Sequence, residues 1–104
     1  MKRIEAIIQP NMLEPVLKGI RKAKVGGLTV IDAQGQGAAE PPLVGNFYPK
    51  TIVIIVVDDD KVDDVMEKIT NVACTKTKGD GKIFVSNIEE STDICSKEKG
   101  IHTL

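Results

Sequence analysis

The chain has 104 residues, of which 41% are hydrophobic and 28% are charged, and its net charge at pH 7 is −1. This length fits one compact domain and excludes a second domain of ordinary size. A folded chain of this size hides roughly two-thirds of the surface that its unfolded form exposes, so a core forms without disulfides or metal. Basic and acidic residues are nearly balanced and form no single-sign stretch, so nucleic acid is not a predicted partner.

The apolar stretches of the chain predict a cytoplasmic protein. The stretch near the N-terminus stops at Ile8, which is too short for a secretion signal. The longest apolar run, 52–57, falls far below the roughly 20 residues that a membrane helix needs. Cys74 and Cys95 lack the spacing of a redox or metal motif, so we expect reduced thiols. The only histidine, His102, lies in a polar tail and is expected to be solvated.

The first third of the chain predicts a strand, a helix and a second strand. Residues 4–8 are short and apolar, as in a buried strand. Apolar residues then recur at intervals of three and four, with basic residues between them, which is typical of an amphipathic helix with Pro15 in its first turn. The apolar positions of this helix are Leu13, Val16, Leu17 and Ile20. A glycine pair at 26–27 follows, and a strand runs from 28 toward Gly35.

A long loop is expected from 35 to 49, where the composition changes to Gly, Ala, Pro and polar residues. The proline pair at 41–42 does not suit a regular helix or a strand ladder. Long loops in compact domains are often functional, so this segment is a candidate for a partner-binding surface. The alternative is a plain hairpin connection.

The second half of the chain repeats the pattern of strand, helix and strand. Residues 52–57 are six consecutive apolar residues, mostly β-branched, which predicts a central strand that is covered on both faces and is the most buried one. Three aspartates at 58–60 follow, and we interpret them as the cap of a helix, with a metal site as the alternative. Val62, Val65, Met66 and Ile69 mark one face of that helix, and 83–85 form a fourth strand.

The predicted order is strand, helix, strand, strand, helix, strand. This order is typical of a ferredoxin-like α+β sandwich, in which a four-stranded antiparallel sheet carries both helices on one face. The other face has no helix to cover it. Burial of this face against other subunits predicts an oligomer.

Two glycine-rich segments are the candidate binding elements. Residues 78–82 read Lys-Gly-Asp-Gly-Lys, and glycines allow the positive φ angles that turn successive amides toward an anion. The segment is not a Walker A motif, because the spacing differs and a strand follows it. The alternative is a tight turn with a solvated Lys82. A second pair, Gly35 and Gly37, closes the second strand and allows close approach of a ligand.

The chain resembles the PII nitrogen regulatory proteins across nearly its whole length. The resemblance rests on residues 1–8, 27–30, the turn 35–37, the pair 49–50 and the string GDGKIFV at 79–85. It implies a single domain over 1–104 that forms a homotrimer, with ATP or ADP in clefts between neighbouring subunits. It also implies no catalysis, and a T-loop, here 37–47, that docks on ammonium transporters or on enzymes of nitrogen assimilation.

The resemblance also assigns roles to individual residues. Thr29 would reach the adenine, and Gly35 and Gly37 would line the nucleotide. The B-loop, about 75–82, would hold the phosphates through Gly79, Asp80, Gly81 and Lys82. Lys50 matches the lysine that contacts 2-oxoglutarate in many members. The C-terminal loop covers about 91–104.

This chain departs from the family pattern at three places. The T-loop is several residues shorter than usual and lacks the tyrosine that some members uridylylate. Ala38 and Ala39 replace an Arg-Gln pair whose glutamine helps to hold magnesium, so Lys50 alone is weak support for 2-oxoglutarate sensing. Asp93 and Cys95 occupy the positions of two arginines that usually bind phosphate in the family.

Loss of one charge-assisted contact costs about 1.5 to 3 kcal/mol, so a nucleotide with fewer phosphates, ADP or AMP, suits this site better than ATP. Three lysines, Lys76, Lys97 and Lys99, restore positive charge if they turn toward the site; otherwise they are solvated.

The leading hypothesis is therefore a PII-like regulator that binds an adenine nucleotide and controls a partner through its loop. One alternative is a ligand-free trimeric scaffold. Another is a small acylphosphatase-like hydrolase, which needs an arginine at the transferring phosphoryl group. The only arginines, Arg3 and Arg21, lie at a strand start and on a helix exterior.

Overall fold

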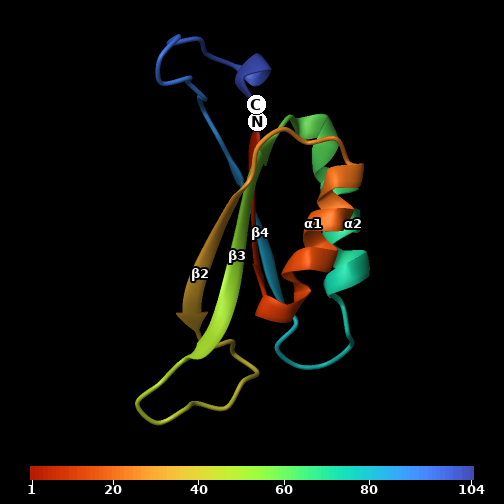
Figure 1. The fold of residues 1–104 in the computed structure, drawn as a ribbon, viewed down its shortest axis with the longest axis vertical. Coiled ribbons are helices and arrows are strands. Elements are labelled where there is room, and N and C mark those ends of the chain that lie inside the picture. The colour runs from red at the N-terminus through yellow and green to blue at the C-terminus, as the bar shows by residue number, and fades with distance from the viewer.

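The computed structural model describes residues 1–104 (Figure 1). Four antiparallel strands form one sheet in the order β2-β3-β1-β4, and both helices cover the same face of it. In chain order the elements are β1 (Lys2–Ile8), α1 (Leu13–Lys22), β2 (Thr29–Gly35), β3 (Tyr48–Val57), α2 (Val62–Ala73) and β4 (Gly81–Asn87). Short 3-10 turns at Pro10–Met12 and Asp59–Lys61 lead into the two helices. The predicted ferredoxin-like sandwich is confirmed.

The core lies between the helices and the sheet. Successive residues of a strand point to opposite faces, so β1 and β3 contribute alternate side chains to it. The strand residues in this cluster are Ile4, Ala6, Ile8, Val53, Ile55 and Val57, and the helices add Val16, Ile20, Val65 and Ile69. The helix residues are those that the spacing of apolar positions predicted, and Pro15 lies in the first turn of α1 as expected.

The second face of the sheet has no helix on it. Ile52, Ile54 and Val56 of β3 point to this open face and are only half-buried. The expectation that this strand is covered on both faces is therefore wrong for the single chain, because one layer of helices covers only one side. The strand is central, as predicted, since it pairs with β1 and β2.

The aspartates before α2 divide between two roles. The Asp58 carboxylate accepts a hydrogen bond of 2.7 Å from the Asp59 amide and so caps the turn that opens the helix, which confirms the capping prediction for this residue. The Asp59 carboxylate lies 3.0 Å from the N-terminal ammonium of Met1 instead. The hydrogen bond that the N-terminal ammonium donates to this carboxylate lowers the pKa of Asp59. One aspartate therefore begins the helix, and another fixes the N-terminus beside it.

The long loop is shorter than the sequence predicted. The strands β2 and β3 pair as far as Gly35 and Tyr48, so the loop spans 36–47. Pro49 lies within β3 because β1 ends opposite Thr51, which leaves Pro49 with a strand neighbour on one side only. The loop projects from one end of the sheet, and the C-terminal segment projects from the other (Figure 1). None of the helices is both long and apolar enough to span a membrane.

Candidate functional site

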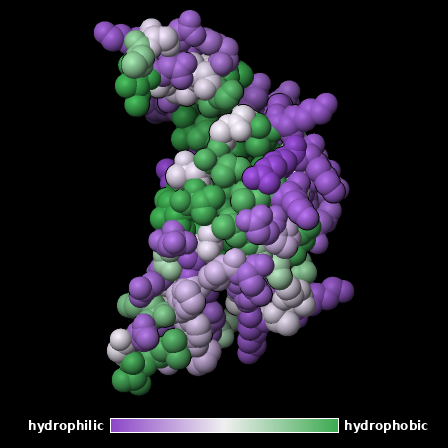
Figure 2. Space-filling view, in the orientation of Figure 1, coloured by the Kyte–Doolittle hydropathy of each residue, from purple (hydrophilic) through white to green (hydrophobic).

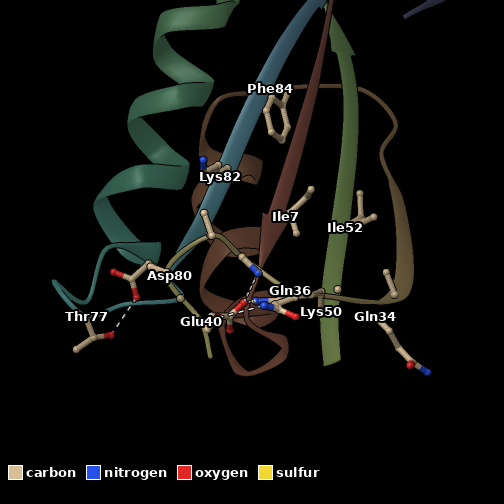
Figure 3. A pocket seen from close by; sticks show the side chains of 17 residues that line it. Ile7, Gln34, Gln36, Glu40, Lys50, Ile52, Thr77, Asp80, Lys82 and Phe84 are labelled. Carbon is tan, nitrogen blue, oxygen red and sulfur yellow. Dashed lines mark hydrogen bonds and ion pairs between the residues drawn. The ribbon is translucent and has the colours of Figure 1, made fainter. Parts of the chain in front are cut away.

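A pocket of about 590 Å³ lies at the end of the sheet from which the loop 36–47 projects (Figure 3). Four segments meet there: Ile7 of β1, the end of β2 with the start of the loop, the first half of β3, and the segment from Thr77 into β4. Of the residues that the sequence singled out, the pocket contains Gly35, Gly37, Lys50, Gly79, Asp80, Gly81 and Lys82. Tertiary structure thus brings both predicted glycine segments to one place.

The segment before β4 depends on two glycines with positive φ. Gly79 has a φ of +86° and Gly81 a φ of +114°, a region that residues with a side chain rarely adopt. A Cβ at Gly81 would lie 1.9 Å from the Ile7 carbonyl oxygen, so a side chain at this position collides with β1. The Gln9 amide group donates a hydrogen bond of 3.0 Å to the Gly79 carbonyl. The loop is therefore fixed against the end of β1.

Asp80 holds this loop together from within. Its carboxylate accepts a hydrogen bond of 2.7 Å from the Thr75 amide, and the hydroxyls of Thr75 and Thr77 also donate to it. The hydrogen bond from the Thr75 hydroxyl is the main reason why the pKa of Asp80 is lowered. Figure 3 shows the carboxylate directed toward Thr77. Asp80 shapes the loop, and the cation Lys82 and backbone amides remain for a ligand.

Lys50 is the most enclosed cation of the pocket, with a side chain only 9% exposed. Its ammonium lies 2.7 Å from an oxygen of Glu40, and the Gly37 amide donates a hydrogen bond of 2.6 Å to the same oxygen. These two donors lower the pKa of Glu40, the Lys50 hydrogen bond contributing most. The ammonium also lies 5.7 Å from the centre of the Tyr48 ring. The charge of Lys50 is thus balanced within the chain.

Thr29 and the C-terminal residues do not reach this pocket within one chain. Thr29 begins β2 and Gly35 ends it, which places them about 20 Å apart at 3.3 Å per residue. Asp93 and Cys95 belong to the C-terminal segment, at the end of the molecule opposite the loop 36–47 (Figure 1). Lys99 pairs with Glu90 at 3.0 Å. The sequence-based site therefore divides into two groups of residues at opposite ends of the subunit.

Sequence reasoning did not single out Glu40 or Gln9 as part of the site, and it included Thr77 only within the bounds of the B-loop, about 75–82. Glu40 and Gln9 act through partners that are distant in sequence, and a single glutamate among alanines and prolines carries no motif. The proximity of Glu40 to Lys50 arises only when β2 pairs with β3. No three His, Cys, Asp or Glu side chains gather where they could hold a metal ion.

Comparison of the sequence with known proteins identifies the family of this chain. The family model described as "Nitrogen regulatory protein P-II" matches residues 1–98. A nitrogen regulatory protein P-II of Mesorhizobium japonicum is 40% identical over 109 aligned residues, which cover 97% of each chain. A "Nitrogen fixation nifHD2 region GlnB-like protein 1" of Methanosarcina barkeri is 38% identical, over 97% of this chain and 100% of the relative. A "Nitrogen fixation nifHD region GlnB-like protein 1" of Methanobacterium ivanovii is 34% identical over the same shares. The chain therefore belongs to the P-II family of nitrogen regulatory proteins.

Proposed function

We propose that this P-II protein is a nitrogen-signalling regulator that binds an adenine nucleotide between subunits and controls a partner protein through its T-loop (37–47). The names of its relatives support regulation in nitrogen metabolism, including nitrogen fixation, and a role other than catalysis. The observation that carries the nucleotide proposal is the meeting of Gly35 and Gly37 with the B-loop, 75–82, in one pocket.

The pocket has the two kinds of lining that a nucleotide needs. Ile7, Ile52 and Phe84 supply apolar surface on the open face of the sheet. The B-loop supplies backbone amides and the ammonium of Lys82. Apolar walls suit a base, and amides with a cation suit phosphate oxygens. A nucleotide that places its base on the sheet and its phosphates at the B-loop satisfies both.

A homotrimer completes this site in the proposal. The open face carries exposed apolar side chains, among them Ile31, which is 41% exposed, and Phe84, which is 52% exposed. Figure 2 shows hydrophobic residues gathered along the middle of the molecule, beside a strongly polar surface on the side of the helices. Packing of this face against neighbours removes apolar surface from water. In such a trimer, Thr29 and the C-terminal segment of one subunit can lie beside the pocket of its neighbour.

The ligand preference follows from the charges of the chain. Asp93 and Cys95 supply no positive charge, so ADP or AMP is expected to bind more tightly than ATP. Ala38 and Ala39 offer no side-chain ligand for magnesium, and Lys50 already has Glu40 as its anionic partner, so neither magnesium nor 2-oxoglutarate is part of the proposal. Lys76 and Lys97 are exposed and have no ion-pair partner. They remain available to supply the positive charge that Asp93 and Cys95 lack.

The T-loop offers an uncharged tip to its partner. No charged residue lies between Glu40 and Lys50, and Leu43, Val44 and Phe47 are exposed. A partner that binds this tip needs an apolar recess rather than a charged surface. An ammonium transporter or an enzyme of nitrogen assimilation or fixation is the class of partner proposed.

Calorimetric titration of ATP, ADP and AMP into the purified protein tests the nucleotide proposal. Saturable binding of about one nucleotide per chain, with ADP or AMP tighter than ATP, is the expected result. Absence of heat with all three at millimolar concentration contradicts it and favours the ligand-free trimeric scaffold. Release of phosphate from acetyl phosphate or ATP would favour the acylphosphatase-like hydrolase instead.

A further inference from the structure

The C-terminal segment presents an apolar side chain that the single chain leaves uncovered. Ile94 is 95% exposed and belongs to a turn at 94–96. Backbone hydrogen bonds fix this turn: the Asp93 amide donates one of 2.9 Å to the Glu98 carbonyl, and the Lys97 amide donates one of 3.0 Å to the Asp93 carbonyl. An isoleucine at a fixed turn is a knob that loses unfavourable contact with water when it enters an apolar recess.

The chain also has a recess that no side chain of its own fills. A second pocket, of about 360 Å³, lies between the C-terminal half of α2 and the start of β4, and we call it the α2–β4 recess. Cys74 is one of its lining residues, and Asp80, Gly81 and Lys82 line both this recess and the nucleotide pocket. The end of the B-loop is therefore the wall between the two cavities. The apolar lining consists of Ile8, Met66, Ile69, Ala73 and Ile83.

The knob and the recess of one chain lie too far apart to meet. The molecule is 47 Å long, and the C-terminal segment projects from one end, whereas α2 ends and β4 begins toward the other (Figure 1). Ile94 can therefore enter the recess only of another copy. Because the two surfaces differ and lie at opposite ends, repetition of the contact places copies head to tail.

The charges around the knob and the recess are complementary. Glu89 and Asp93 lie near the knob, are exposed and have no ion-pair partner in the chain. Lys76 and Lys78 of the B-loop are also exposed and unpaired. Opposite charges on two surfaces guide their approach and fix their register. An acidic turn and a basic loop thus favour a second copy over an unrelated partner.

We propose that Ile94 of one subunit enters the α2–β4 recess of the next, so that three copies close head to tail into a ring. The inference rests on the proposed trimer: burial of the open face removes the larger apolar surface, and the knob fixes the orientation in which neighbours meet. A head-to-tail contact closes only at a fixed number of copies. In the ring, the turn of one subunit packs against the wall of its neighbour's nucleotide pocket.

The two natural cysteines test this contact directly. Cys95 follows Ile94 and Cys74 lines the recess, and both thiols are free and exposed. A short bismaleimide, which joins two nearby thiols without an oxidant, is added to the dilute protein before a denaturing gel. Products of two and three chains are expected, and none larger. Cys74→Ser and Cys95→Ser should each give no product, because each cysteine meets only the other kind.

A second measurement removes the knob. Loss of a buried isoleucine side chain should weaken assembly at least about tenfold, so Ile94→Ser is expected to dissociate at correspondingly higher concentration in sedimentation and to give little linked product. Val44→Ser is the matched control, because Val44 is an equally exposed apolar residue at the T-loop tip. It should assemble like the natural protein. Neither side chain is part of the core, so both variants are expected to fold.

Three results overturn the inference. A natural protein that sediments as a trimer without any linked product overturns the knob contact and leaves the trimer standing. Products that stop at two chains, or continue beyond three, overturn the head-to-tail ring. Assembly of Ile94→Ser equal to that of Val44→Ser overturns the role of Ile94. A natural protein that sediments as a monomer contradicts the proposed trimer itself, and a failed nucleotide titration contradicts only the nucleotide proposal.

Discussion

Gly81, at the start of β4, lies so close to Ile7 of β1 that a Cβ would come within 1.9 Å of the Ile7 carbonyl oxygen. The contact occurs where the B-loop ends and β4 begins, one residue before Lys82, which pairs with Ile7. The path of the B-loop into the pocket therefore depends on a residue that has no side chain.

The variant Gly81→Ala should destabilise the protein. A strained φ costs about 1 to 3 kcal/mol, and forced overpacking costs a similar amount, so the free energy of unfolding is expected to fall by about 2 to 5 kcal/mol. Urea denaturation at one chain concentration measures it, since stability of an oligomer depends on concentration.

Gly27→Ala is the matched control, because a Cβ at Gly27 meets no atom within 4 Å and its φ is not positive. It should change the free energy of unfolding by less than about 0.5 kcal/mol. Equal effects of the two variants would contradict the role given to Gly81.

The stability of the protein should fall in acid partly because of Asp80. Hydrogen bonds from Thr75 lower the pKa of Asp80 in the folded state, so below about pH 3.9, the usual value for aspartate, the unfolded state binds the proton more readily. This contribution is therefore fully present above that pH and is lost as the pH falls through the lower, folded pKa. Thermal unfolding measured between about pH 2 and about pH 7, on both sides of the usual aspartate pKa of about 3.9, follows this loss of stability.

Replacement of Asp80 isolates this effect. Asp80→Asn should lower the melting temperature at neutral pH and flatten the acid part of the profile. Asp32→Asn, at an exposed position of β2, serves as the control and should keep the profile of the natural protein. Unchanged slopes in both variants would show that the Thr75 contacts do not stabilise the ionised Asp80.

Lys82 should carry part of the nucleotide affinity. Loss of a charge-assisted contact costs about 1.5 to 3 kcal/mol, so Lys82→Gln is expected to weaken ADP binding by roughly ten- to a hundredfold in calorimetry. Lys18→Gln, on the exposed side of α1, removes the same charge away from the pocket and should bind ADP normally. An equal loss in both variants would indicate a general charge effect instead of a phosphate contact.

A charge on the open face should prevent the proposed trimer from forming. Ile31 points to this face beside Ile52, and burial of an unpaired carboxylate there costs several kcal/mol. Ile31→Glu is expected to sediment as a monomer, whereas the natural protein and Val44→Glu, altered at the fully exposed loop tip, sediment as trimers. A trimeric Ile31→Glu variant would place the interface elsewhere.

The local pattern of residues was sufficient to predict the elements and the fold. The spacing of Val16 and Ile20, and of Val65 and Ile69, follows the helical repeat, and short β-branched runs such as 52–57 form strands, because these periods follow from backbone geometry alone. The glycines at 79 and 81 were recognisable for the same local reason, since positive φ is open to glycine.

The contacts of the site were decided only by tertiary structure. Pairing of β2 with β3 brings Glu40 to Lys50, and pairing of β1 with β4 brings Gln9 to Gly79, contacts that depend on register rather than on motif. The direction of the Asp80 carboxylate is likewise set by Thr75. Sequence alone identified the candidate binding segments, because backbone preference is local. Tertiary structure determined which charges remain unpaired, because ion pairing depends on distance through space.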